Sequence, residues 1–248
     1  MLSVIIIAKN ESANIRRCLE SVLWADEIVV LDSGSTDDTA WIAQQYTSKV
    51  FFTDWQGYGI QKQRALSHAT QTWVLNLDAD ETVDDALKSE ILKVTASNQF
   101  DACRIPIRMC FYGKQLRISS PTRHARLFKR EGAYFSADIV HEKIILPAHA
   151  RIKQLKTPIW HHSYQDLSHA IAKMNRYSSY SAQIRLQAKK RHSLLKTLMS
   201  SFWMFFRCYV LQAGFLDGRA GFLFATLNAQ GSFYRGMKQI YVDQQVLK

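Results

Sequence analysis

Four short apolar runs, about 25 residues apart, constrain the fold of the first hundred residues more than any other feature of the sequence. The runs are rich in Val and Ile and occupy residues 3–8, 27–31, 49–53 and 73–77. The segments between them carry apolar residues at helical spacing. Strands that alternate with helices form βαβ units, in which helices cover both faces of a parallel sheet. The sequence therefore predicts an α/β fold for this half of the chain.

Polar and acidic residues follow the predicted strands. Asn10 and Glu11 come after the first strand, Asp32 after the second, and Asp78 and Asp80 after the fourth. In open α/β sheets, ligands bind beyond the carboxyl ends of the strands. Carboxylates that converge there repel one another unless a cation or a donor-rich ligand lies among them. Asp78 and Asp80 flank a single Ala directly after an apolar strand, so we expect both side chains to point to the same side of an extended backbone. Two oxygen ligands on one side suit a divalent cation that also holds phosphates.

A structural alternative explains part of this pattern. Ser35 and Asp38 have the spacing of a helix capping box. The sequence contains neither a GxGxxG motif after the first strand nor a GxxxxGK[ST] motif. A nucleotide bound at this sheet is therefore held by a different arrangement from the dinucleotide fingerprint or the P-loop.

The segment 101–160 contains short apolar runs separated by single prolines, which predicts further strands and a mixed sheet. A basic cluster in this segment is formed by Arg123, His124 and Arg126. It either contacts donor phosphates or a phosphorylated acceptor, or lies on a solvated hairpin. His161 and His162 follow the last run, and at most one of two adjacent strand residues faces a given site.

Charge is distributed unevenly along the chain, whose formal net charge is +11. Residues 1–100 hold eight Lys and Arg against fourteen Asp and Glu, whereas residues 101–248 hold 24 against seven. This asymmetry indicates an anionic partner for the second half: nucleic acid, an anionic membrane surface or a phosphorylated substrate. A solvated basic face is the alternative.

The cysteines and the apolar content indicate the compartment. Four Cys without a CxxC pair fit a reducing environment. The sequence shows no signal peptide and no run of 18 uncharged apolar residues, so we expect neither export nor a membrane-spanning helix.

Residues from 166 onward have a helical pattern. A stripe of Leu, Met, Phe and Tyr runs from Leu194 to Val210, and basic residues, including Lys189 and Lys196, precede or open it. This pattern is typical of a helix that lies in the plane of a membrane surface. The same stripe could instead pack on the catalytic domain or form a dimer interface.

Four motifs, in order, carry a resemblance to a known family. They are SVIIIAKNESANIRRCLESV, EIVVLDSGSTDDT, the Lys62-Gln63-Xaa-Ala-Leu segment and WVLNLDADE. Over about the first 100 residues they resemble the nucleotide-sugar half of family 2 glycosyltransferases of the GT-A fold. Three later motifs, VHE at 140–142, WHHSYQDL at 160–167 and GFLDGRAGF at 214–222, resemble the bacterial lipopolysaccharide-core β-glycosyltransferases, many of which transfer glucose onto an inner-core heptose.

The resemblance implies roles for the residues of the donor site. The turn containing Ala8, Asn10 and Glu11 lies against the uridine, and Asp32 accepts from the uracil ring or the ribose. Lys62 lies near the nucleotide or the diphosphate, with Arg64 as a substitute.

The resemblance also implies a metal site and a catalytic base. Asp78 contacts the ribose or a metal-bound water, and Asp80 binds Mg²⁺ or Mn²⁺ through the diphosphate. His161 is implied as a metal or phosphate contact. Glu142 is implied as the base, although the Asp-Glu-Asp style run that often precedes this position in the family is missing here.

We therefore predict a Rossmann-like mixed sheet of the GT-A type flanked by helices. The catalytic domain is expected over residues 1–165, with a nucleotide-sugar half at 1–100 and an acceptor half at 101–165. A helical, basic and amphipathic region is expected over 166–248, as a membrane-surface extension.

The predicted function is inverting transfer of a hexose, glucose first, from a UDP-sugar to a lipid-linked saccharide, the inner-core heptose of lipopolysaccharide. A polyprenyl-phosphate or another glycan is the alternative acceptor. We expect a cytoplasmic enzyme held at the inner face of the bacterial inner membrane by anionic lipid, without a nucleic-acid partner. The alternatives from other classes are a nucleic-acid-binding protein, a sugar nucleotidyltransferase and a non-catalytic membrane adaptor.

Overall fold

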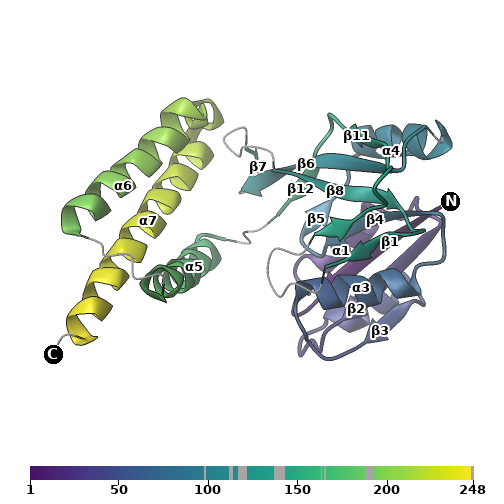
Figure 1. The fold of residues 1–248 in the computed structure, drawn as a ribbon, viewed down its shortest axis with the longest axis horizontal. Coiled ribbons are helices and arrows are strands. Elements are labelled where there is room, and N and C mark those ends of the chain that lie inside the picture. Colours follow the sequence, from purple (N-terminus) through teal and green to yellow (C-terminus); the bar gives the residue numbers. More distant parts are fainter. Residues whose placement is uncertain are drawn as a thin grey trace. The chain divides into compact units, whose positions relative to one another are not determined.

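Four parallel strands form one end of a large sheet in the computed structural model (Figure 1). The strands are β1 (Leu2–Ala8), β2 (Glu27–Asp32), β3 (Val50–Phe52) and β4 (Trp73–Asp78). Their order is β3-β2-β1-β4, and Val4 of β1 lies between Ile28 of β2 and Leu75 of β4. The four predicted strands are thus confirmed, with their ends shifted by one residue at most.

The structure describes residues 1–97, 99–111, 114–116, 122–136, 143–162, 164, 166–187 and 193–246. The described strands join in a ten-stranded sheet whose main path is β3-β2-β1-β4-β8-β6-β12-β5. Beyond β4 the sheet is mixed, because β8 (Thr122–Lys129) is antiparallel to both β4 and β6 (Ala102–Phe111). The smaller strands are β5 (Glu81–Thr82), β7 (Lys114–Gln115), β11 (Ile152–Gln154) and β12 (Ile159–His161). A separate two-stranded antiparallel sheet pairs β9 (Tyr134–Phe135) with β10 (Ile144–Ile145). The predicted α/β fold with a mixed sheet and flanking helices is therefore confirmed.

Alternate residues of the central strands enter two separate cores. Val4 and Ile6 pack on one face with α1 (Ile15–Glu20), α2 (Thr39–Gln44) and α4 (Asp85–Ser97), whereas Ile5 and Ile7 pack on the other face with α3 (Tyr58–His68) and β9. The strands are apolar on both sides for this reason. With both faces covered, the strand ends are left to hold ligands.

The chain divides into two compact units. The first comprises Met1–Arg108 and Pro121–His162, and the second comprises Met109–Ser120 and Ser163–Lys248. The second unit contains α5 (Leu167–Gln187), α6 (Leu194–Phe206), a π-helical turn η1 (Arg207–Leu211), a 3₁₀ turn η2 (Gly214–Asp217) and the long helix α7 (Gly218–Val246). Both α5 and α6 pack against α7. In the part of the chain that the structure describes, no helix is long and apolar enough to cross a membrane.

The GFLDGRAGF motif forms the tight connection into α7. A Cβ atom on Gly221 would lie 2.0 Å from the carbonyl oxygen of Gly214 and 2.7 Å from the Cβ of Asp217, so only glycine fits at this position. Gly218, at φ +59°, has the left-handed backbone that glycine favours. The Nζ of Lys114 donates to the carbonyl of Asp217 at 2.8 Å, which ties β7 to this turn. The packing of the turn thus requires the glycines of the motif.

Candidate active site

The loops that follow β1 and β2 hold each other through hydrogen bonds. Asn10 has a left-handed backbone, at φ +57°. Its N–H donates to the Oγ of Ser35 at 2.9 Å, and its Oδ1 accepts from the N–H of Thr36 at 2.8 Å. The N–H of Glu11 donates to the Oγ1 of Thr39 at 2.7 Å. The structure thus places Asn10 and Glu11 beside the β2 loop, at the carboxyl edge of the sheet.

Asp32 organises the β2 loop. The residue is 1% exposed and pairs with Ala8 across β1 and β2. Its carboxylate accepts from the N–H of Gly34 at 3.0 Å, and from both the N–H and the hydroxyl of Ser35 at 2.9 and 2.5 Å. The predicted capping box is wrong, because the Ser35 hydroxyl bonds to Asp32 and Asp38 makes no side-chain cap at the start of α2. Side-chain bonds within a loop compete with helix caps in this way.

Asp78 lies at the end of β4 between two cations. Its Oδ1 is 3.0 Å from the Nζ of Lys62, and its Oδ2 is 2.9 Å from an Nη of Arg126. Burial opposes ionisation, but the charges of Arg126 and Lys62 hold the pKa of Asp78 well below its usual range. The sequence pattern predicted that a bound cation or ligand would neutralise the carboxylates at this edge. At Asp78 the protein itself supplies the positive charges, from Lys62 and Arg126.

The backbone does not stay extended after Asp78. The chain turns at residues 79–80 and re-enters the sheet as β5. The expectation that Asp78 and Asp80 lie on one side of an extended strand is therefore wrong. The turn instead directs Asp78 toward Lys62 and Asp80 toward His161.

Glu81 and Arg126 complete the buried network, and sequence reasoning missed both roles. An Nη of Arg126 is 2.8 Å from the Oε1 of Glu81, and the Oε2 of Glu81 accepts from the N–H of Asp78 at 2.9 Å. Burial, opposed by Arg126 and reinforced by the charge of Asp78, raises the pKa of Glu81 to about 7. The solvated-hairpin interpretation of the basic cluster does not hold for Arg126, which is 7% exposed and bonded to carboxylates. Its contact with donor phosphates or a phosphorylated acceptor stays a prediction. The acidic DADE run was the sequence signal that could have identified Glu81 as a site residue. The contact of Arg126 with these carboxylates follows only from the pairing of β8 with β4.

Asp80 pairs with His161, which arrives from a distant part of the chain. β12 is antiparallel to β5, with His161 opposite Glu81. The Nε2 of His161 lies 2.9 Å from the Oδ2 of Asp80. Although burial opposes protonation, the hydrogen bond and the charge of Asp80 raise the pKa of His161 above its ordinary value. His162 points elsewhere, to the hydroxyl of Thr82 at 3.0 Å, and burial lowers its pKa to about 4.

The strands and loops of this sheet edge lie within a segment that matches a known family model. A family model described as glycosyl transferase family 2 matches residues 3–162. The chain belongs to glycosyltransferase family 2.

Relatives of this glycosyltransferase cover nearly its whole length. An uncharacterized glycosyltransferase of Rickettsia felis is 32% identical over 247 residues, which cover 94% of this chain and 87% of the relative. The lipopolysaccharide core biosynthesis glycosyltransferase LpsC of Rhizobium meliloti is also 32% identical, over 96% of this chain and 91% of the relative. Among solved structures, S. aureus TarS 1–349 in complex with UDP is similar at 16% identity and a TM-score of 0.49, over 98% of this chain and 91% of that one. The family assignment makes the chain an enzyme and overturns the non-catalytic alternatives.

The donor atoms of the Asp80–His161 pair fit a divalent cation shared with a diphosphate. Among the described residues, no three His, Cys, Asp or Glu side chains form an all-protein metal cage. Mg²⁺ at nucleotide sites is commonly held by one or two protein ligands together with phosphate oxygens and water. Asp80 offers a carboxylate oxygen and His161 an imidazole nitrogen, which also suits Mn²⁺. The oxygens of Asp78 lie against Lys62 and Arg126, whose positive charges repel a metal cation, so Asp80 is the better candidate for this role.

One other predicted site residue of the glycosyltransferase, Arg64, lies apart from this network. Positions 62 and 64 point to different sides of α3, and Arg64 bonds to Asp54 at 2.9 Å and to the Oγ1 of Thr53 at 2.6 Å. The structure thus brings Lys62, and not Arg64, to Asp78. Glu142, the predicted base, lies outside the described residues.

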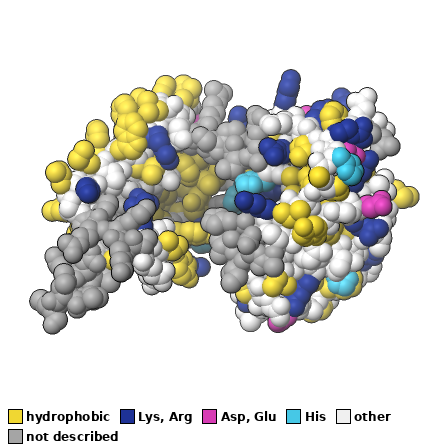
Figure 2. Space-filling view, in the orientation of Figure 1, with side chains coloured by type: hydrophobic (Ala, Val, Ile, Leu, Met, Phe, Trp, Pro, Cys, Tyr) yellow, Lys and Arg dark blue, Asp and Glu magenta, His cyan; other side chains and the backbone are white. Residues whose placement is uncertain are grey.

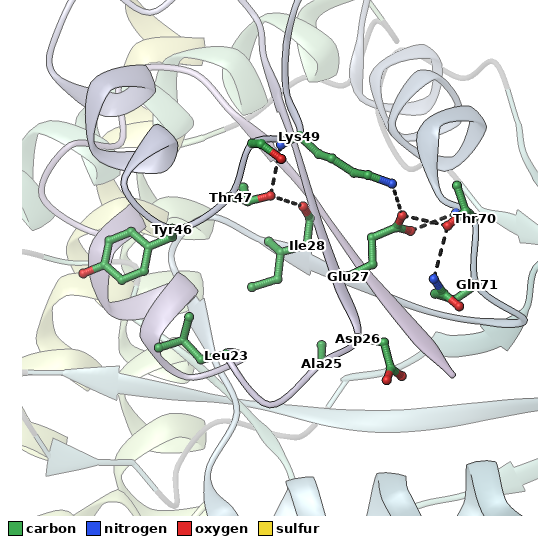
Figure 3. A pocket seen from close by; sticks show the side chains of 11 residues that line it. Leu23, Ala25, Asp26, Glu27, Ile28, Tyr46, Thr47, Lys49, Thr70 and Gln71 are labelled. Atoms are coloured by element: carbon green, nitrogen blue, oxygen red, sulfur yellow. Dashed lines mark hydrogen bonds and ion pairs between the residues drawn. The ribbon is translucent and has the colours of Figure 1, made fainter.

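A polar pocket of about 480 Å³ lies at the opposite, amino edge of the sheet (Figure 3). Figure 3 shows Lys49 and Glu27 directed toward each other, with Glu27 also bonded to Thr70. These bonds join the amino ends of neighbouring strands. We therefore assign the charged groups of this pocket to stabilising the sheet. The candidate active site of the glycosyltransferase is the carboxyl edge.

Proposed function

We propose that this glycosyltransferase moves a hexose, glucose first, from a UDP-sugar to a lipid-linked saccharide, namely the inner-core heptose of lipopolysaccharide. The name of the R. meliloti relative, which aligns over 91% of its length, supports a role in lipopolysaccharide core biosynthesis. The motifs VHE, WHHSYQDL and GFLDGRAGF support the same acceptor. Since that acceptor is carried by lipid, we place the reaction at the inner face of the inner membrane.

One observation carries the donor half of this proposal: an ion-pair network, in which Asp78 alone is half-buried, holds the end of β4 while Asp80 and His161 face each other beside it. Lys62 and Arg126 keep Asp78 ionised and fixed. We assign Asp78 to the ribose or a metal-bound water, and Asp80 with His161 to Mg²⁺ or Mn²⁺. The bound ion would neutralise the charge that develops on the departing diphosphate.

The uridine is assigned to the loops that follow β1 and β2. Ala8, Asn10 and Glu11 form one wall, and Asp32 the other. The hydrogen bonds between these loops favour this assignment, because they preorganise both walls before the ligand arrives. One lone-pair position of the Asp32 Oδ2 is left for an N–H or O–H of the nucleoside after the bond from Ser35 is counted.

The transfer step is a single displacement with inversion. The acceptor oxygen forms a bond to the anomeric carbon, the bond from that carbon to the diphosphate oxygen breaks, and UDP leaves. Glu142 takes the proton of the acceptor hydroxyl as the new bond forms. An α-linked UDP-sugar then gives a β-linked product.

A donor screen tests the first half of the proposal. Thermal shift with Mn²⁺ and a set of UDP-hexoses should show one preferred donor, because a ligand at 100 times its Kd stabilises the protein by about 2.7 kcal/mol. Asp80→Ala should lose the shift, whereas Asp54→Asn, at an exposed ion pair, should keep it.

An acceptor assay tests the second half. Radiolabelled sugar from the preferred donor should appear in a lipopolysaccharide core that ends at the heptose, with UDP released in equal amount. Transfer to polyprenyl phosphate and not to the core would identify the alternative acceptor. No stabilisation by any UDP-sugar would overturn the donor assignment.

A further inference from the structure

A solvent-exposed apolar face covers α6 and the turns that follow it (Figure 2). We call this set the apolar face: Leu194, Leu195, Leu198, Met199, Phe202, Trp203, Val210, Leu211, Phe215, Leu216 and Phe222, each between 44 and 72% exposed. The α6 members form three adjacent pairs that recur every four residues and so share one side of the helix. Phe222 contacts Phe205 and Tyr209, which connects the α7 end of the face to α6 and η1. Exposed apolar patches of this kind mark interaction surfaces.

The side of α6 that packs on α7 is built from small and polar residues over residues 197–201, whereas Met204 and Phe205 near the end of the helix pack on the apolar core of the second unit. Thr197 is fully buried, and a Cβ atom on Gly236 of α7 would lie 2.4 Å from its Oγ1. The hydroxyl of Ser201 donates to the carbonyl of Ala229 at 2.8 Å. The hydroxyl of Ser232 lies 3.3 Å from that of Ser200.

This arrangement is the reverse of an ordinary surface helix, which turns its apolar stripe toward the core. Close helix contacts through Gly, Ala, Ser and Thr, with large apolar side chains outward, are typical of helices surrounded by lipid. Thirteen residues are too few to span a bilayer, which takes about 20. The geometry of α6 therefore fits a helix lying in the plane of a bilayer surface.

Charge decides between a lipid surface and a second copy of the chain. Lys196, Arg207 and Arg219 are exposed on or beside the apolar face. Residues 163–248 contain twelve Lys and Arg and only three Asp. Two such basic surfaces repel each other, whereas anionic headgroups attract them. Trp203, at 54% exposure, is of the residue type that prefers the boundary between headgroups and acyl chains.

We propose that the apolar face docks in the plane of an anionic phospholipid bilayer, with α6, η1 and η2 inserted at the depth of the headgroups. The flanking basic residues bind the lipid phosphates, and the apolar side chains enter the acyl boundary. Binding by this face requires neither a sugar donor nor an acceptor. Vesicle binding therefore tests it independently of the proposed transferase reaction.

The experiment is co-sedimentation of the full chain with phosphatidylcholine vesicles, with and without phosphatidylglycerol. We expect binding to the anionic vesicles that weakens as salt rises. The double variant Phe202→Ser/Trp203→Ser should lower the partition coefficient at least about tenfold, because the apolar side chains supply the insertion energy. Trp41→Ser is the matched control, since Trp41 is 60% exposed on α2 of the first unit, and it should bind as the wild type does.

Further variants separate lipid docking from the other possible roles of the face. Lys196→Gln and Arg219→Gln should each weaken binding to anionic vesicles about fivefold. If the double variant fails to fold, Leu195→Gln, at a position 67% exposed, replaces it with the same expected direction. Brominated acyl chains should quench the fluorescence of the wild type more than that of Trp203→Phe.

Three results would overturn the proposal. One is equal binding, or none, to neutral and anionic vesicles. Another is a lowered melting temperature of the variants with unchanged vesicle binding, which would mean that the face packs within the protein. The last is a concentration-dependent dimer in sedimentation equilibrium that Phe202→Ser abolishes, which would assign the face to a second copy.

Discussion

Glu27→Gln tests whether one buried carboxylate joins the amino edge of the sheet (Figure 3). Glu27 begins β2 and is 7% exposed. Its carboxylate accepts from Lys49 and the hydroxyl of Ser3, and from both the N–H and the hydroxyl of Thr70 at 2.8 Å. These donors come from β1 and from the segments before β3 and β4. The substitution keeps the shape, but it removes the charge and places an amide donor against other donors.

The magnitude follows from the pKa of this carboxyl. Although burial raises it, the bonds from Lys49, Ser3 and Thr70 prevail and lower the pKa of Glu27 from 4.5 to about 2. That difference is equivalent to about 3 kcal/mol of stability at neutral pH. This stability difference is an upper limit, because the Lys49 side chain is 40% exposed and water screens its charge.

The sign of the pH dependence follows from the same values. A carboxyl whose pKa is lowered by folding stabilises the protein fully above its unfolded pKa of 4.5, and this contribution is lost as the pH falls toward 2. The stability of the wild type should therefore exceed that of Glu27→Gln by at most about 3 kcal/mol at pH 7 and by at most roughly 1.5 kcal/mol at pH 3.

Urea denaturation followed by circular dichroism at pH 7, 5, 4 and 3 measures this difference. Asp54→Asn is the control, because Asp54 also pairs with a cation but is 64% exposed, and its stability should match the wild type. A loss below about 1 kcal/mol at pH 7, or a difference that stays constant down to pH 3, would refute the reasoning.

Three further substitutions test the site and the second unit. Asp80→Ala should abolish the effect of Mn²⁺ on UDP-sugar binding in calorimetry while the fold is retained; affinity that is unchanged with and without EDTA contradicts the metal role. Glu142→Gln should keep donor binding and lower transfer by roughly two to four orders of magnitude. Near-normal transfer would place the base elsewhere, and Asp138 would be tested next. Gly221→Ala should destabilise the second unit by about 1–3 kcal/mol in urea denaturation, since its Cβ would overlap the Gly214 carbonyl; wild-type stability would mean that the turn tolerates a side chain.

The first half of the fold was readable from the sequence because its signals are local. Alternating strands and helices are recorded in the periodicity of short segments, and β1 to β4 lie where the four apolar runs predicted them. The positions of Asp32 and Asp78 at strand ends follow from the same pattern. The turn at Ala79 was not readable, because nothing in the DADE run distinguishes a strand that continues from one that reverses.

The partners of the acidic residues were decided by the tertiary structure. Arg126 is 48 positions from Asp78, and His161 is 81 positions from Asp80. Each pair forms because an antiparallel strand, β8 or β12, lies at one particular register in the sheet. A sequence shows that a strand exists, but its neighbours and register depend on contacts with the whole sheet.

The same division holds for α6. The sequence by itself determined that residues 194–206 form a helix with an apolar stripe, because a period near 3.6 requires only local information. The period of the apolar stripe is the same whether the stripe faces the neighbouring helix or faces away from it. The contact of Thr197 with Gly236 sets the rotation of the helix about its axis, because only small side chains let α6 approach α7 so closely. The tertiary structure thus decided that the stripe over residues 194–203 turns away from α7.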